Sequence, residues 1–168
     1  MNTAHWHLLL NHLPMVGIVI GTTILAGGYI FKNNPTIKAT ALGVFVLSAL
    51  VAIPAYLTGE GAEDIAEKMP GVTEGFIEHH EDLGKIFLIL AESLGVMAIF
   101  ALIMFRLKSK LAPTLFGIVL IAALGTSIFA KQVGTSGGQV RHTEIRNSNA
   151  QPLDQATEQN GGAEQDDD

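Results

Sequence analysis

The chain has 168 residues, of which 48% are hydrophobic and 15% are charged, so it is more apolar than an ordinary soluble domain. Without cysteine it has no disulfides, no thiolate metal sites, no iron–sulfur clusters and no haem attached through Cys-x-x-Cys-His. The net charge of −6, with no basic patch, excludes nucleic acid as a partner and favours the lipid bilayer.

Four apolar stretches follow one another along the chain, and each is close to the roughly 20 residues that a membrane-spanning helix needs. They cover residues 13–31, 39–57, 86–105 and 111–130. No Lys or Arg precedes Lys32, so the first stretch lacks the positive region of a signal peptide, and we expect it to be retained. Because backbone in lipid must satisfy its own hydrogen bonds, the predicted fold class is all-α.

The connections predict how these helices are arranged. Segments 32–38 and 106–110 are short, which makes antiparallel neighbours of the helices that they join, whereas segment 58–85 is long. We therefore expect an integral membrane, up-down four-helix bundle over residues 1–146. Residues 147–168 are polar and acidic, and we expect a disordered tail there.

The two short connections carry five basic residues and no acid, which predicts that they face the cytoplasm. These residues are Lys32, Lys38, Arg106, Lys108 and Lys110. Both termini and the acidic segment 58–85 would then lie on the periplasmic side of a bacterial inner membrane. Within that segment, residues 62–69 are expected to form a short helix that ends at Pro70-Gly71 and lies on the membrane surface.

All six histidines fall at the same predicted end of the bundle. His5, His7 and His12 precede or open the first helix, His79 and His80 lie near the start of the third, and His142 follows the fourth. Imidazole is a common ligand of transition metals and of b-type haem iron. The histidines are therefore the leading functional feature of the sequence.

Bis-imidazole haem ligation needs one neutral histidine from each of two facing helices. His12, one turn above the apolar stretch, and His80, on a face of small residues, are the leading pair of ligands. His7, His79 and His142 are the alternates, and His5 is the expected bystander. Gly137-Gly138 is expected to form a tight turn that folds His142 back onto the bundle. The sequence thus favours a membrane protein that binds haem b for electron transfer within a respiratory assembly.

Two other functions remain open. A copper or zinc site could use histidines and acids at the same end, although no histidine pair has the i,i+4 spacing. A membrane scaffold or respiratory-complex subunit would bind no cofactor. An enzyme is not supported, because no arrangement of nucleophile, base and oxyanion donors can be read from the sequence.

Glu92 is the one acid within an apolar stretch, which makes it a candidate for function. It could carry protons, accept a hydrogen bond from Thr22 or Thr23, or serve a structural role as a neutral acid. We favour the structural role, because no second buried ionisable group continues a proton path toward the cytoplasm.

The start of the first helix resembles a family of small bacterial four-helix membrane proteins without an assigned activity. The family pattern His-Pro-x-x-Val-His-Phe-Pro reads here His7-Leu-Leu-Leu-Asn-His12-Leu-Pro14, with the histidine spacing and the last proline kept. A histidine near the start of the third helix and a Gly-Gly segment before His142 also match. The resemblance implies that His7, His12, His80 and His142 share one site, and it extends distantly to four-helix b-type cytochromes.

Overall fold

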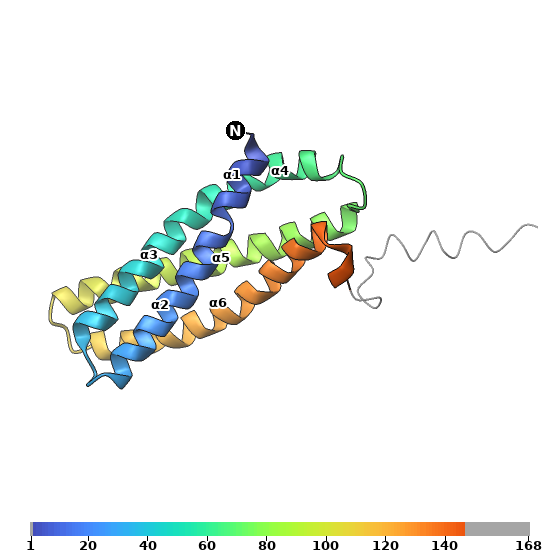
Figure 1. The fold of residues 1–168 in the computed structure, drawn as a ribbon. Helices are drawn as coiled ribbons and strands as arrows, with labels where there is room; N and C mark the ends of the chain where they lie inside the picture. Colours follow the sequence, from blue (N-terminus) through green and yellow to red (C-terminus); the bar gives the residue numbers. More distant parts are fainter. Residues whose placement is uncertain (1, 147–168) are drawn as a thin grey trace, which may run out of the picture.

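The computed structural model describes residues 2–146 and is helical with no strand in that range (Figure 1). The helices are α1 (Thr3–Leu10), α2 (His12–Ile30), α3 (Pro35–Leu57), α4 (Gly59–Ala66), α5 (Glu74–Arg106) and α6 (Ala112–Arg141), followed by a 3-10 turn, η1 (Thr143–Ile145). The predicted tail, 147–168, lies outside the described residues.

Four helical segments are long and apolar enough to cross a membrane, as the hydrophobic stretches predicted. They are Thr3–Ile30, Pro35–Leu57, Glu74–Arg106 and Ala112–Arg141. Helices α2, α3, α5 and α6 lie side by side, and each packs against two of the others, in the cyclic order α2, α3, α5, α6 (Figure 1). The short helix α4 packs against α1 at the end where α5 begins.

The helices extend beyond the apolar stretches at the end that carries the histidines. Helix α5 begins at Glu74 and α6 continues to Arg141, so each has about three additional turns in polar sequence. The hydrophobic signal locates the part that crosses lipid, whereas the helix continues as long as neighbouring helices pack against it. The expected helix at 62–69 is found three residues earlier, as α4, and the turn that follows contains Gly71 at φ +79°.

Small residues set how closely the helices approach. Gly21 lies against Phe45, where an added Cβ would be 2.6 Å from the ring, and Gly95 lies equally close to the Ala49 side chain. Within a membrane, such close packing replaces the hydrophobic effect as the main attraction between helices. The small residues of α2 and α5 are therefore packing surfaces.

The opposite end contains a buried lysine. Lys38, at the start of α3, is 4% exposed, and its ammonium lies 3.7 Å from the centre of the Tyr29 ring of α2 and 5.6 Å from that of Phe116 of α6. Its Nζ also donates a hydrogen bond to the side chain of Asn33. Sequence placed Lys38 in a loop, but the structure encloses its charge between aromatic faces.

Candidate functional site

His7 and His80 come together at the end of the long helices where α1 packs against α3 and where α5 packs against α6. Their ring centres are 6.5 Å apart, and the ring planes are inclined at 81°. Both side chains are half-buried, and both lie beyond the apolar stretches at 13–31 and 86–105. A residue from the first turns of the chain thus meets one from its middle.

The break between α1 and α2 and the end of α3 position His7. His7 Nδ1 lies 3.0 Å from the carbonyl oxygen of Ala55, in the last turn of α3. The Ala55 carbonyl also accepts from the Thr58 hydroxyl at 3.0 Å, and the imidazole N–H uses its second lone pair. Because a carbonyl only accepts, Nδ1 carries the hydrogen, and Nε2 of neutral His7 keeps its lone pair.

His80 is anchored to α6 in the same manner. Its Nδ1 lies 2.9 Å from Ser136 Oγ, and the Ser136 hydroxyl donates its hydrogen to the Val133 carbonyl at 2.9 Å. The hydroxyl therefore accepts from His80 Nδ1, which again leaves Nε2 as the nitrogen with a lone pair. Ring orientation and tautomer of both histidines are fixed by partners behind the rings, as in metal sites.

Both imidazoles are held in the neutral form. Burial lowers the pKa of His7 below its ordinary value, and the positive charge of nearby His12 adds to this, against the effect of the Ala55 carbonyl. Burial likewise lowers the pKa of His80, with further lowering by the charges of His7 and His79. Two adjacent imidazoles that stay neutral near pH 7 are suitable ligands for a metal.

A glycine inside α6 provides the room for His80. A Cβ added at Gly137 would lie 2.9 Å from His80 Cε1 and 3.3 Å from Nε2, so any side chain there would displace the ring. The expectation of a tight turn at Gly137-Gly138 is wrong, because both residues are helical and α6 ends only at Arg141. Gly138 instead accommodates Ile145, whose Cδ1 would be 3.1 Å from an added Cβ.

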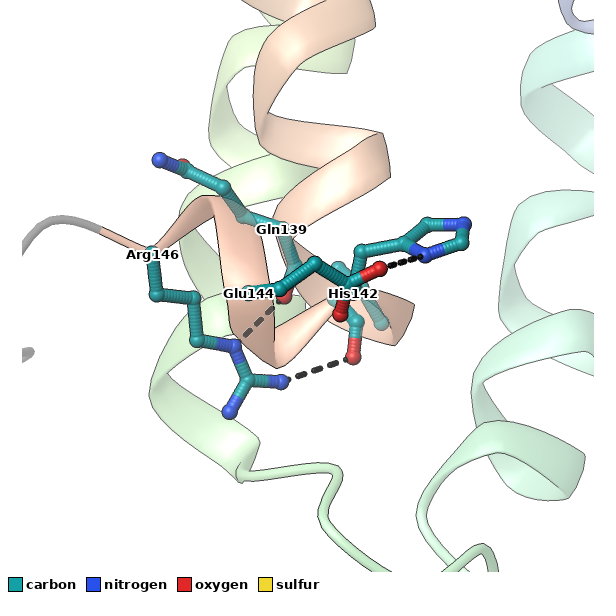
Figure 2. Close-up of polar contacts among 5 residues, drawn as sticks. Gln139, His142, Glu144 and Arg146 are labelled. Carbon is teal, nitrogen blue, oxygen red and sulfur yellow. Dashed lines mark hydrogen bonds and ion pairs between the residues drawn. The ribbon is translucent and has the colours of Figure 1, made fainter.

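The other predicted ligands are not brought to this pair. His12 is exposed, with Nδ1 bonded to the side chain of its neighbour Asn11, although sequence favoured it as the inward residue. His5 and His79 are exposed as well. His142 is exposed and lies 2.9 Å from Glu144 Oε1, as Figure 2 shows, and it does not fold back onto the helices.

The acids near the site do not bond the two imidazoles. Glu81 and Asp82 pair instead with Lys85, at 3.0 and 3.5 Å. The pKa of Glu63, on α4, is raised by burial and by neighbouring acids, chiefly Glu81. Within residues 2–146, no group of three or more His, Asp or Glu side chains is placed to hold a metal ion.

The ring separation can be compared with that of two imidazoles bound to one metal ion. A metal about 2 Å from each of two ring nitrogens holds the ring centres roughly 5 to 6.5 Å apart, depending on the bond angle. The observed 6.5 Å lies at the upper end of this range, so the two imidazoles could both contribute to one metal centre.

Glu92 lies away from the histidines, on the membrane-spanning part of α5. Its Oε1 is buried and has no hydrogen-bond partner among the described residues. The alternative of a hydrogen bond from Thr22 or Thr23 is not formed, because Thr22 donates to the Ile18 carbonyl and Thr23 to the Val19 carbonyl. An apolar hollow between α3 and α5 is lined by residues 40–47 and 99–103 and contains no histidine.

The sequence reasoning missed Ser136, Gly137 and the Ala55 carbonyl. One signal was present for choosing between His7 and His12, since five residues on a helix amount to about 140°, so that the two cannot face the same way. Searches against models of known families, curated proteins and solved structures found no match for the chain.

Proposed function

We propose that this protein binds a redox-active metal centre through His7 and His80 at the periplasmic end of an up-down, membrane-spanning four-helix bundle in a bacterial inner membrane. The favoured centre is b-type haem, and the favoured function is electron transfer, either alone or beside other respiratory subunits. Haem iron between two imidazoles carries one electron at a time.

One observation supports this proposal above the others. His7 and His80 come from helices far apart in sequence, and each uses Nδ1 to bond an oxygen behind it, at 3.0 and 2.9 Å. Each ring therefore keeps the Nε2 lone pair for another partner. Interfacial histidines that merely face water would not need anchored rings, nor a glycine to admit one of them.

The experiment is a reduced-minus-oxidised absorption spectrum of the full chain purified in mild detergent, with metal analysis of the same sample. We expect an α-band of low-spin haem that is lost in His7→Ala and in His80→Ala. The matched control is His12→Ala, which removes an exposed imidazole from the start of α2 and should leave the band unchanged. A band that survives in both His7→Ala and His80→Ala would refute the assignment of the ligands.

A copper ion is the second candidate, and it is favoured by the close packing around the pair. A single ion between the two rings needs none of the space around them that a macrocycle requires. Binding by two imidazoles alone suits Cu(I) better than Zn(II), which prefers four ligands. A colourless preparation with one copper per chain, lost in the same two variants, would favour this reading over haem.

A protein that contains neither haem nor metal, even after reconstitution with haem and with Cu(I), would favour the scaffold. In that case the anchored histidines would serve to join α1 to α3 and α5 to α6. The same three variants then report on stability alone, and His7→Ala and His80→Ala should be less stable than His12→Ala.

A further inference from the structure

Arg146 lies at the outer end of the interface between α5 and α6. The 3-10 turn η1 folds the chain back after α6, with Ile145 packed on Gly138, so that the Arg146 side chain returns toward the helix that it follows. Its Nε donates to the Gln139 carbonyl at 2.7 Å, and one terminal nitrogen donates to the Val140 carbonyl at 3.0 Å. Figure 2 shows the guanidinium turned toward the Gln139 backbone, on the side away from the His142–Glu144 pair.

These two bonds satisfy carbonyls that the end of α6 leaves open. The last four carbonyls of a helix have no intrahelical partner. Here the Gly138 carbonyl accepts from the His142 backbone N–H, and Arg146 donates to the carbonyls of Gln139 and Val140. Three glycines in the last two turns of α6, Gly134, Gly137 and Gly138, weaken this part of the helix, each by about 1 kcal/mol relative to alanine. Arg146 offsets that weakness.

The same side chain also holds α5 and the loop before it. Its terminal nitrogen lies 3.0 Å from the Gly71 carbonyl, between α4 and α5. Its guanidinium carbon lies 4.3 Å from the centre of the Phe76 ring, which is itself only 5% exposed. A planar guanidinium can bond several carbonyls and stack on a ring at once, whereas a lysine ammonium cannot.

The registers of the two helices link this clamp to the histidine site. Phe76 precedes His80 by four residues, and Val140 follows Ser136 by four residues. Each pair is one helical turn apart, or about 5.4 Å. Arg146 thus bridges α5 and α6 one turn outside the point where His80 bonds Ser136.

We propose that Arg146 is a positioning residue for His80, which keeps the outer turns of α5 and α6 together so that the His80–Ser136 hydrogen bond holds the imidazole opposite His7. Arg146 would have this role for any group that His7 and His80 bind. The inference rests on the proposed function only because it treats His80 as a ligand.

The test compares Arg146→Ala, Arg146→Lys and Arg141→Ala in the full chain in detergent micelles. Arg141 is an exposed arginine on the last turn of α6, so its variant removes the same charge without the clamp. The first readout is backbone amide hydrogen exchange over residues 74–80 and 133–141. The second is the ¹⁵N chemical shift of His80, which reports the tautomer.

We expect Arg146→Ala to accelerate exchange in both segments at least tenfold and to shift His80 away from the Nδ1–H tautomer. Arg146→Lys should recover only a small part of the protection, and Arg141→Ala should match the original protein. Wild-type exchange in both segments of Arg146→Ala, or full rescue by lysine, would overturn the proposal. If Arg146→Ala does not fold, Phe76→Leu removes the ring face alone and should accelerate exchange in the same two segments, and unchanged exchange there would overturn it.

Neither readout requires a bound group. Absence of haem and metal from the purified protein would count against the proposed function and leave this inference intact. Conversely, an α-band lost in His80→Ala, together with unchanged amide exchange in Arg146→Ala, would support haem binding and refute the positioning role of Arg146. Where haem is bound, Arg146→Ala should also broaden or shift its α-band.

Discussion

Replacing Gly137 by alanine tests whether the site depends on the close contact between α6 and His80. The added Cβ would lie 2.9 Å from His80 Cε1. Carbon atoms in ordinary contact are about 3.5 Å or more apart, so the ring must move by roughly 0.6 Å. That movement misaligns the 2.9 Å bond to Ser136 or presses the ring against His7.

The size of the effect follows from two opposing contributions. Alanine in place of glycine favours the helix by about 1 kcal/mol. Overpacking a filled site costs about 1 to 3 kcal/mol. Gly137→Ala should therefore be neutral or destabilising by up to about 2 kcal/mol. The matched control is Gly134→Ala, three residues earlier on α6, where the added Cβ meets no atom within 4 Å and only the gain of about 1 kcal/mol remains.

Unfolding of both variants by SDS in mixed micelles gives the comparison, and the ¹⁵N shift of His80 reports the ring. We expect Gly137→Ala to be about 1 to 3 kcal/mol less stable than Gly134→Ala, because the helix-propensity gain is common to both. The His80 signal should change only in Gly137→Ala. Equal stability of the two variants, with an unchanged His80 signal, would refute the packing argument.

Three further predictions concern ionisation and buried polar groups. The lowered pKa values of His7 and His80 mean that the unfolded chain binds protons more readily, so stability should be constant above about pH 6.5 and fall below it. A variant with both histidines changed to glutamine should lose most of this dependence, and an identical pH profile would contradict it. Ser136→Ala should lower the free energy of unfolding by about 1 to 2 kcal/mol, because His80 Nδ1 loses its acceptor. Thr135→Ala, on the exposed side of α6, should change it by no more than about 0.5 kcal/mol. Unfolding of the two variants gives the comparison. Glu92→Leu removes a buried oxygen that has no hydrogen-bond partner among the described residues, so it should stabilise the protein by about 1 kcal/mol or more and leave the metal content unchanged. Destabilisation, or loss of the metal, would show that Glu92 has more than a structural role.

The four helices that are long and apolar enough to cross a membrane could be predicted from the sequence, because the requirement concerns only one continuous stretch of chain. A stretch of about 20 apolar residues satisfies it regardless of its neighbours. The polar ends of α5 and α6 could not be predicted in this way, since they are helical where Arg146 and Phe76 hold them together, and these residues are 70 positions apart. Hydrophobicity carries no information on such contacts.

The choice between His7 and His12 shows a second limit. Depth relative to the apolar stretch favoured His12, but depth does not fix the direction of a side chain. His7 turns inward to the Ala55 carbonyl at the end of α3, where it and the Thr58 hydroxyl share one acceptor oxygen. That carbonyl belongs to the backbone of another helix, so no pattern of side chains in the sequence predicts its contact with His7.

Lys38 combines two properties that are usually separate in membrane proteins. Positive charges in loops bias the orientation of a segment during insertion and remain in water afterwards. The Lys38 ammonium instead comes to lie beside the rings of Tyr29 and Phe116, so the charge that marks one end of the α2–α3 pair also fills the space between that pair and α6. Substitutions at Lys38 will therefore alter insertion and packing together. Lys32, which is exposed in the same connection, is the position at which the charge can be varied alone.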